Sequence, residues 1–304
     1  MKAIASFGMK SFIAVSIFIV NTKLFWTLIK YINKIGKKPL IKSIFVTYPA
    51  EKKYADYYCF TWMREMFQWK IGIIGFHYQN GYFGLNFATP TYEEKLTSPN
   101  NKEAFASMIY KIVELKEYAG IEYVNYGGVI PSYLQKRELP THQSANNDLI
   151  AQVIVQAVRK MLKDEEVAVN ECFFFILGGK GFIGTKVSQI IKDFKYPHMI
   201  IDKDDEYDFK STDKKYNVII NVSRKGVFEL YKDQMDENTL MLNEVFPPPR
   251  IKDSEIKTAY HLKGIKATVF PSMPYDYSNV MPCCSLVSEK EEDQFDVVIK
   301  PIKR

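Results

Sequence analysis

The stretch CFFFILGGKGFIG, residues 172–184, decides how the second half of this chain folds. Its first six residues are uniformly apolar, as expected for a β-strand that is buried on both faces of a sheet. Glycines follow directly, and apolar residues then recur at helical spacing from Phe182 to Phe194. A strand, a glycine-rich turn and a helix in this order predict the start of a βαβ unit.

The glycines have the spacing G-x-G-x-x-G, which after a buried strand is typical of a dinucleotide-binding turn. Gly179 permits the tight turn, Gly181 leaves space for a pyrophosphate, and Gly184 lets the helix pack closely on the strand. The start of the helix offers unpaired N–H groups and a positive dipole end to the phosphates. A turn whose glycines serve packing alone is the alternative. The sequence therefore predicts an NAD(P) site formed by Gly179, Lys180, Gly181, Phe182, Ile183 and Gly184.

Residues farther along the chain complete this predicted site. Asp202 follows a second predicted strand, at 198–201, and lies 18 residues beyond the last glycine. A carboxylate there accepts hydrogen bonds from the ribose hydroxyls of NAD and repels the extra phosphate of NADP. NAD is therefore favoured over NADP, although the neighbouring Lys203 weakens that preference. Ligands bind outside the carboxyl ends of parallel strands, so the residues after the third predicted strand also belong to the site: Asn221, Ser223 and Arg224. A solvated basic turn is the alternative for Arg224.

The alternation of strands and helices after Val169 predicts a small parallel-sheet Rossmann domain over residues 166–304. The link from Asp202 to Tyr216 is almost wholly polar. We therefore expect the usual second crossover helix to be reduced or absent.

Residues 39–165 precede this domain and have a different pattern. They contain a predicted strand at 41–49, a hairpin at 71–89 with a turn at Asn80-Gly81, and a helix that ends before Gly120. The predicted fold class is therefore α/β, with an N-terminal α/β substrate domain followed by the Rossmann domain.

An apolar helix and a basic linker make up residues 1–38, with the apolar run FIAVSIFIV at 12–20. The run is shorter than the roughly 20 residues that span a bilayer. Three interpretations stay open: a helix that contacts a membrane surface through residues 11–32, a cleaved signal peptide, and a helix packed on the protein's own body. Lysines cluster after the apolar run, and this bias places the body on the cytoplasmic side of any membrane it contacts.

Composition narrows the class of protein further. The chain has 304 residues, of which 47% are hydrophobic and 25% charged, and its net charge is +6. Its lysines form no long basic block, so no nucleic-acid partner is expected. The four cysteines contain no C-x-x-C pair, so we predict no metal site and a reducing, cytoplasmic compartment. Association into a homo-oligomer is left open.

Four residues are candidates for catalysis. Cys283 and Cys284 lie near the C-terminus, and a thiolate beside a nicotinamide suggests thioester chemistry. A buried, unreactive cysteine pair is the alternative. His261 and His142 are candidate proton donors, and a structural histidine is the alternative for each.

The order of segments resembles the long-chain acyl-[acyl-carrier-protein] reductases, which make fatty aldehydes. The resemblance covers about two thirds of the chain and rests on AGIEYVNYGGVIPSYL (119–134), GGKGFIG (178–184), YNVIINVS (216–223), LMLNEVFPPP (240–249), HLKGI (261–265) and MPCCSL (281–286). It implies a substrate domain before a Rossmann domain, NADPH as cofactor, and a nucleophilic cysteine that matches Cys284 better than Cys283. Ser285 and Leu286 stand where that family has a helical segment with a glutamate, and Asp202 favours NADH.

These observations favour an oxidoreductase that transfers hydride from NAD(P)H to a carbonyl or acyl thioester of a lipid-like substrate. One alternative is a two-domain dehydrogenase of the shikimate or methylene-tetrahydrofolate kind, which uses a lysine and an acidic residue on a small polar substrate. A second alternative is a membrane-associated protein that binds NAD(H) without catalysis.

Overall fold

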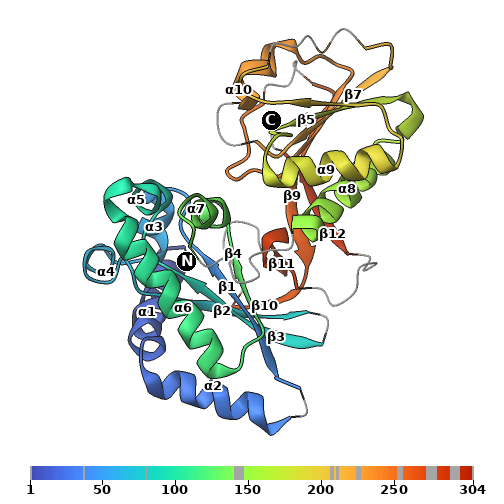
Figure 1. Cartoon of the computed structure of the whole chain (residues 1–304). Coiled ribbons are helices and arrows are strands. Elements are labelled where there is room, and N and C mark those ends of the chain that lie inside the picture. The colour runs from blue at the N-terminus through green and yellow to red at the C-terminus, as the bar shows by residue number, and fades with distance from the viewer. Residues whose placement is uncertain are drawn as a thin grey trace. The chain divides into compact units, whose positions relative to one another are not determined.

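The chain is an α/β protein that divides into two compact units (Figure 1). Unit 1 comprises Met1–Ala145 and Ala267–Val287, and unit 2 comprises Asn146–Lys266 and Ser288–Arg304. The computed structural model describes residues 2–36, 38–79, 81–139, 147–205, 209, 212–223, 227–251, 256–271, 279–287 and 295–302.

Unit 1 is built on a mixed sheet with the strand order β10-β2-β3-β1-β4. Its strands are β1 (Ile41–Thr47), β2 (Gly72–Gln79), β3 (Tyr82–Ala88), β4 (Tyr123–Tyr126) and β10 (Thr268–Phe270). Strand β1 runs parallel to β3 and β4, while β2 and β3 form an antiparallel hairpin. Gly81 in the hairpin turn has φ +84°, in the region that a type I′ turn requires. The predicted strand–turn–strand is therefore confirmed.

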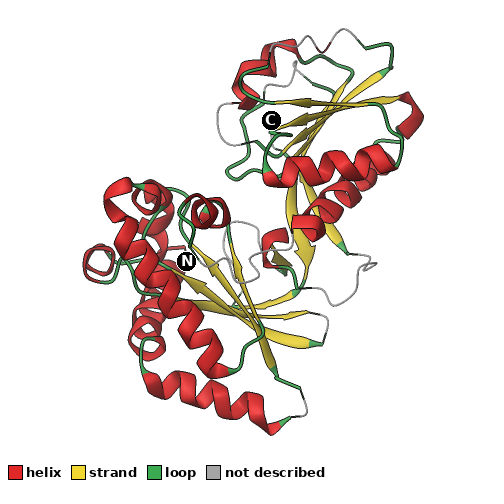
Figure 2. Cartoon of the chain, viewed as in Figure 1, coloured by secondary structure: helices red, strands yellow, loops and turns green. Residues whose placement is uncertain are grey.

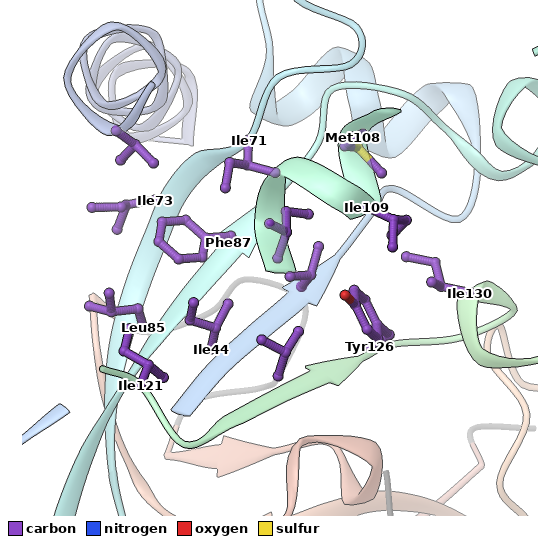
Figure 3. Close-up of a cluster of buried hydrophobic side chains, with 14 of the residues drawn as sticks. Ile44, Ile71, Ile73, Leu85, Phe87, Met108, Ile109, Ile121, Tyr126 and Ile130 are labelled. Atoms are coloured by element: carbon purple, nitrogen blue, oxygen red, sulfur yellow. The ribbon is translucent and has the colours of Figure 1, made fainter. Parts of the chain in front are cut away.

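Helices cover one face of this sheet and enclose the main core of unit 1 (Figure 3). They are α1 (Lys2–Val20), α2 (Lys23–Ile35), α3 (Lys52–Tyr58), α4 (Thr61–Met66), α5 (Glu93–Thr97), α6 (Lys102–Ala119) and α7 (Ile130–Lys136). Met108 and Ile109 of α6 pack in one cluster with Ile44, Leu85 and Phe87 of the sheet. Other positions of these strands carry buried polar side chains, among them Ser43, His77 and Asn86.

The N-terminal helices α1 and α2 belong to unit 1 and pack on its sheet. Ile17 of α1 is buried, and Trp26 of α2 is buried and donates its indole N–H to the Val20 carbonyl at 2.7 Å. No helix in the described part of the chain is by itself long and apolar enough to cross a bilayer. Phe7–Val20 and Lys23–Ile35 meet that criterion of length and composition only as a pair bent by 83°.

Unit 2 contains the predicted Rossmann sheet, whose parallel strands run in the order β9-β8-β7-β5-β6. The strands are β5 (Cys172–Leu177), β6 (His198–Ile201), β7 (Tyr216–Asn221), β8 (Thr239–Asn243) and β9 (Thr258–Lys266), and β12 (Val297–Pro301) pairs antiparallel with β9. Helices α8 (Asn147–Asp164) and α9 (Phe182–Asp193) pack side by side, and α10 (Val227–Tyr231) follows β7 (Figure 2).

The described residues between β6 and β7 contain no α-helix. Phe209 from this link is fully buried, with its ring 4.6 Å from that of Phe175 and 5.5 Å from that of Tyr231. A single aromatic side chain thus covers apolar surface that a second crossover helix covers in larger sheets of this kind.

The compact units divide the chain differently from the predicted domains 39–165 and 166–304. Helix α8 lies in unit 2, where it packs on α9 and β9. Residues 267–287, which contain β11 (Val280–Met281), belong to unit 1. The chain passes from unit 2 back to unit 1 within two residues, since β9 ends at Lys266 and β10 begins at Thr268. This passage is too short for a linker that the sequence could indicate.

Candidate dinucleotide site and a thiol-bearing polar face

The glycine turn of unit 2 connects β5 directly to α9. The Gly181 N–H donates to the Gly178 carbonyl at 3.0 Å and closes the turn. Gly181 is the N-cap residue of α9, and no side chain caps that end of the helix. The first-turn N–H groups of α9 therefore have no side-chain acceptor and are available to an anion.

The space around each glycine shows why a side chain is excluded. A Cβ on Gly184 would lie 2.3 Å from the Gly178 carbonyl oxygen and 2.5 Å from the Gly179 Cα, and a Cβ on Gly179 would lie 2.4 Å from the Ile200 side chain. By contrast, a Cβ on Gly181 would meet only the Gly178 oxygen, at 3.1 Å. Gly179 and Gly184 are therefore required for packing. Gly181 is less crowded, because a side chain there would meet a single backbone atom, so the residues present fit a pyrophosphate.

The turn lies at the point where the strand order of the sheet reverses. Strand β5 has β6 on one side and β7 on the other, all three parallel. The loops after β5 and β7 are adjacent there, since a Cβ on Gly178 would lie 2.6 Å from the Ser223 Cα. Open α/β sheets bind ligands at the carboxyl ends of the strands on either side of such a switch point.

Asp202 directly follows β6, and its neighbours form a charged cluster with the glycine turn. The Asp202 N–H donates to the Asp205 carboxylate at 2.8 Å, and Asp205 also pairs with Lys180 at 2.6 Å. Hydrogen bonding to Asp205 raises the pKa of Lys180, and the same bond lowers the pKa of Asp205. Lys180 stands between the first two glycines of the turn, and its ammonium group is paired with the Asp205 carboxylate. This pairing makes the lysine less available to a phosphate.

Three polar side chains form a row across the sheet, at the carboxyl ends of β7 and β8 and within β9. Asn221 is in register with Asn243, and Asn243 is in register with His261. The Asn221 amide donates to the Asn243 side-chain oxygen at 2.7 Å, and the Ser223 hydroxyl donates to Asn221 at 2.6 Å. Ser223 lies against Gly178 of the glycine turn, and its bond to Asn221 ties the row to that turn.

His261 ends the row and is almost fully buried. Its Nδ1 lies 3.0 Å from the Asn243 carbonyl oxygen, so Nδ1 carries the proton and Nε2 has a lone pair. Nε2 has no hydrogen-bond partner among the described residues. Burial, with a smaller contribution from Lys263, lowers the pKa of His261 to about 4. A neutral imidazole at pH 7 suits positioning of Asn243 better than donation of a proton.

Cys283 and Cys284 form a 3-10 turn, Cys283–Ser285, in unit 1 and not in the unit that carries the glycines. Cys283 is buried and Cys284 half-buried. The Asn125 side chain of β4 donates to the Ser285 carbonyl at 2.9 Å and so fixes the turn on the sheet.

A partly buried tyrosine, Tyr48, directly follows β1 and interacts electrostatically with Cys284 of this turn. Tyr48 donates to Glu93 at 3.1 Å and accepts from the Val129 N–H at 2.8 Å. Burial raises the pKa of Tyr48, and the charges of Glu93 and Cys284 add to that shift. The Tyr48 hydroxyl is therefore protonated at neutral pH and linked to a carboxylate.

Unit 1 contains a second buried network, which no motif in the sequence indicates. His77 of β2 donates from Nδ1 to Asn86 of β3 at 2.7 Å, and the Ser43 hydroxyl of β1 lies 3.1 Å from its Nε2. Burial lowers the pKa of His77 to about 4, although the bond to Asn86 acts in the opposite direction. All three side chains are buried, and Asn86 also contacts the Met281 sulfur. Residues 281–287 thus cover a polar face of the sheet.

Comparison with known proteins adds little to this geometry. No protein-family model matches the chain, and no curated protein matches it. Among solved structures, a D-isomer specific 2-hydroxyacid dehydrogenase from Lactobacillus delbrueckii ssp. bulgaricus, in its NAD complexed form, is 13% identical. The match covers 66% of this chain and 70% of that one, with a TM-score of 0.22. The resemblance to acyl-[acyl-carrier-protein] reductases finds no support in these comparisons.

The predicted residues thus fall into three groups. The structure brings the glycines together with Asp202, Asn221 and Ser223 in unit 2. It assigns Cys283 and Cys284 to unit 1. His142 and Arg224 lie outside the described residues. In the described part of the chain, no three His, Cys, Asp or Glu side chains are grouped as metal ligands.

Proposed function

We propose that this chain is a cytoplasmic NAD(P)H-dependent oxidoreductase that reduces a carbonyl or acyl thioester of a lipid-like substrate. The observation that carries the proposal is the glycine turn at the switch point of a parallel sheet. It combines a helix N-terminus that no side chain caps with a glycine, Gly181, that leaves the N-cap position without a side chain. Such a helix N-terminus can bind a dinucleotide pyrophosphate through its backbone N–H groups.

Each part of the cofactor has residues in unit 2 that would hold it. The N–H groups at the start of α9 would bind the pyrophosphate, and Asp202 would accept hydrogen bonds from the adenosine ribose. The carboxylates of Asp202 and Asp205 favour NADH, since they repel a 2′-phosphate and Asp205 already occupies Lys180. When bound, a reduced nicotinamide supplies the hydride for the reaction.

The row of Asn221, Asn243 and His261 would orient groups at the carboxyl ends of β7 and β8. The Asn221 amide is fixed by its bond to Asn243 at 2.7 Å, and the Asn243 amide by its donation to the Val245 carbonyl at 2.7 Å. Groups fixed in this way need no reorganisation when charge develops nearby. We assign His261 a positioning role, because burial keeps its imidazole neutral.

Cys284 is our candidate for the acyl acceptor. In this step its sulfur forms a bond to the acyl carbon, and the bond to the leaving thiol breaks with its electron pair. The proton that the Cys284 thiol loses in this step balances the proton that the leaving thiolate takes up, so the exchange needs no further acid.

The test is aldehyde formation from a long-chain acyl thioester with NADH or NADPH. Cys284→Ala is expected to abolish product while leaving NADH affinity unchanged, and the control Cys59→Ala is expected to keep activity. Cys59 is a suitable control, because burial raises the pKa of its thiol to about 11. Turnover that survives Cys284→Ala would favour a dehydrogenase of the shikimate or methylene-tetrahydrofolate kind. Tight binding of NAD(H) without turnover of any carbonyl substrate would favour a non-catalytic protein, and absence of nucleotide binding refutes the proposal.

A further inference from the structure

The first 50 residues have an unusual charge pattern. They contain eight lysines and no aspartate or glutamate. The chain as a whole is nearly balanced, with 41 basic and 35 acidic residues. The positive charge is therefore concentrated on the segment that forms α1, α2 and β1.

Helix α2 is apolar on two opposite faces. Trp26, Ile29 and Asn33 are buried against unit 1. On the other face Leu24, Leu28 and Ile35 recur at helical spacing, with exposed fractions of 79%, 57% and 85%. The first face packs on the core of unit 1. The second face is exposed, and nothing in the described part of the chain covers it.

Helix α1 has the same arrangement. Ile17 is buried, and the Ser16 hydroxyl donates to the Ile73 carbonyl of the sheet at 3.2 Å. Phe7, Val15 and Phe18 are more than half exposed, although the rings of Phe7 and Phe18 also touch Phe60 and Phe67 at their edges. The residues Phe7, Val15, Phe18, Leu24, Leu28 and Ile35 together form what we call the N-terminal apolar face. Monomeric soluble proteins seldom expose so many large apolar side chains on neighbouring helices.

Lysines lie beside this face. Lys23 and Lys34 are exposed on one flank of α2, between its buried and its exposed apolar residues. Lys30 lies on the same flank, with its ammonium 4.3 Å from the Tyr118 ring centroid. A helix with an exposed apolar stripe and a cationic flank is suited to the boundary between lipid headgroups and acyl chains.

We propose that the N-terminal apolar face docks on the surface of a membrane that contains anionic phospholipids. A second copy of the chain fits less well, since a symmetric contact would bring the lysines of both copies together with no acidic partner from this segment. A membrane-spanning arrangement is disfavoured as well. It would remove Trp26 and Ile17 from the core of unit 1. The proposal is independent of the oxidoreductase activity proposed above.

The experiment is flotation of the full chain with vesicles of phosphatidylcholine alone or of phosphatidylcholine and phosphatidylglycerol in equal parts. We expect binding to the anionic vesicles only, weakened by added salt. The triple variant Leu24→Gln, Leu28→Gln, Ile35→Gln is expected to bind about tenfold more weakly, or worse, for each leucine or isoleucine removed. Lys23→Gln with Lys34→Gln is expected to cost about fivefold per lysine.

Matched control variants change exposed residues elsewhere. Leu230, Tyr110 and Phe270 are also more than half exposed, so their triple replacement by glutamine is expected to leave vesicle binding unchanged. Lys192→Gln with Lys195→Gln is the corresponding charge control. All the changed side chains are solvent-exposed, so circular dichroism and the unfolding temperature should match those of the native chain.

Three results would overturn the proposal. The first is equal binding to neutral and anionic vesicles. The second is full binding by the Leu24, Leu28, Ile35 variant. The third is absence of vesicle binding together with a dimer, seen by analytical ultracentrifugation, that the same variant dissociates. That last result would assign the face to a second copy of the chain.

Discussion

Replacing Gly181 by alanine separates dinucleotide binding from folding. Gly181 has φ −77° and ψ 171°, which alanine adopts without strain. Its new Cβ would meet only the Gly178 oxygen at 3.1 Å. We expect the free energy of unfolding to change by less than about 1 kcal/mol, since loss of a glycine N-cap and reduced freedom of the unfolded chain oppose each other.

The same methyl group would stand between the backbone and a bound pyrophosphate. Overpacking of one methyl typically costs about 1–3 kcal/mol. Applied to binding, that range corresponds to an increase in Kd of about 5–150-fold. Titration calorimetry with NADH and NADPH measures this change directly.

Gly184→Ala is the informative comparison, because its Cβ would lie 2.3 Å and 2.5 Å from backbone atoms of the turn. Here the helix itself must move, so stability falls by about 1–3 kcal/mol and the unfolding temperature by roughly 2–4 °C for each kcal/mol. Gly8→Ala is the control, since its Cβ meets nothing within 4 Å. The reasoning is refuted if Gly181→Ala binds NADH as tightly as the native chain, or is destabilised as much as Gly184→Ala.

Three further predictions concern other groups of the structure. Asp205→Asn frees Lys180, so the ratio of NADPH to NADH affinity should rise about tenfold in fluorescence titrations; an unchanged ratio contradicts the specificity argument. Burial lowers the pKa of both His77 and His261 to about 4, so the folded chain binds fewer protons than the unfolded chain between pH 6.5 and 4. The free energy of unfolding from urea titrations should therefore be insensitive to these groups above about pH 6.5 and fall below it, by up to about 1.4 kcal/mol per pH unit for each histidine. A slope that His261→Gln leaves unaltered would exclude His261 as a source. Finally, iodoacetamide should modify half-buried Cys284 faster than buried Cys283, as peptide mass spectrometry would reveal, and the reverse order would count against its assigned role.

Local chemistry explains what the sequence predicted correctly. The strand, glycine turn and helix at 172–193 depend on apolar periodicity and on backbone positions that only glycine fills. The same is true of the hairpin around Gly81 and of the end of α6, where Gly120 has φ +66°. Each of these features is determined by a short run of neighbouring residues. It can therefore be predicted without knowing which distant residues it contacts.

Only the tertiary structure decided where distant segments lie. Residues 267–287 belong to unit 1 and bring Cys284 within electrostatic range of Tyr48, although the sequence suggested that they belong with the Rossmann domain. His77 and Asn86 meet because the register of the hairpin sets His77 opposite Gly84 and Gly75 opposite Asn86, which brings the two side chains to diagonal positions on one face. A one-residue change of register would move one of them to the opposite face of the sheet.

The N-terminal helices show the same division. Their apolar character was evident from the sequence, but a continuous apolar segment does not specify which side of a helix is buried. That choice depends on the competition among all apolar surfaces for the sheet of unit 1, and it places Trp26 inside and Leu24 outside. Strand register and burial are properties of the whole folded chain, because they are set by contacts between residues far apart in sequence.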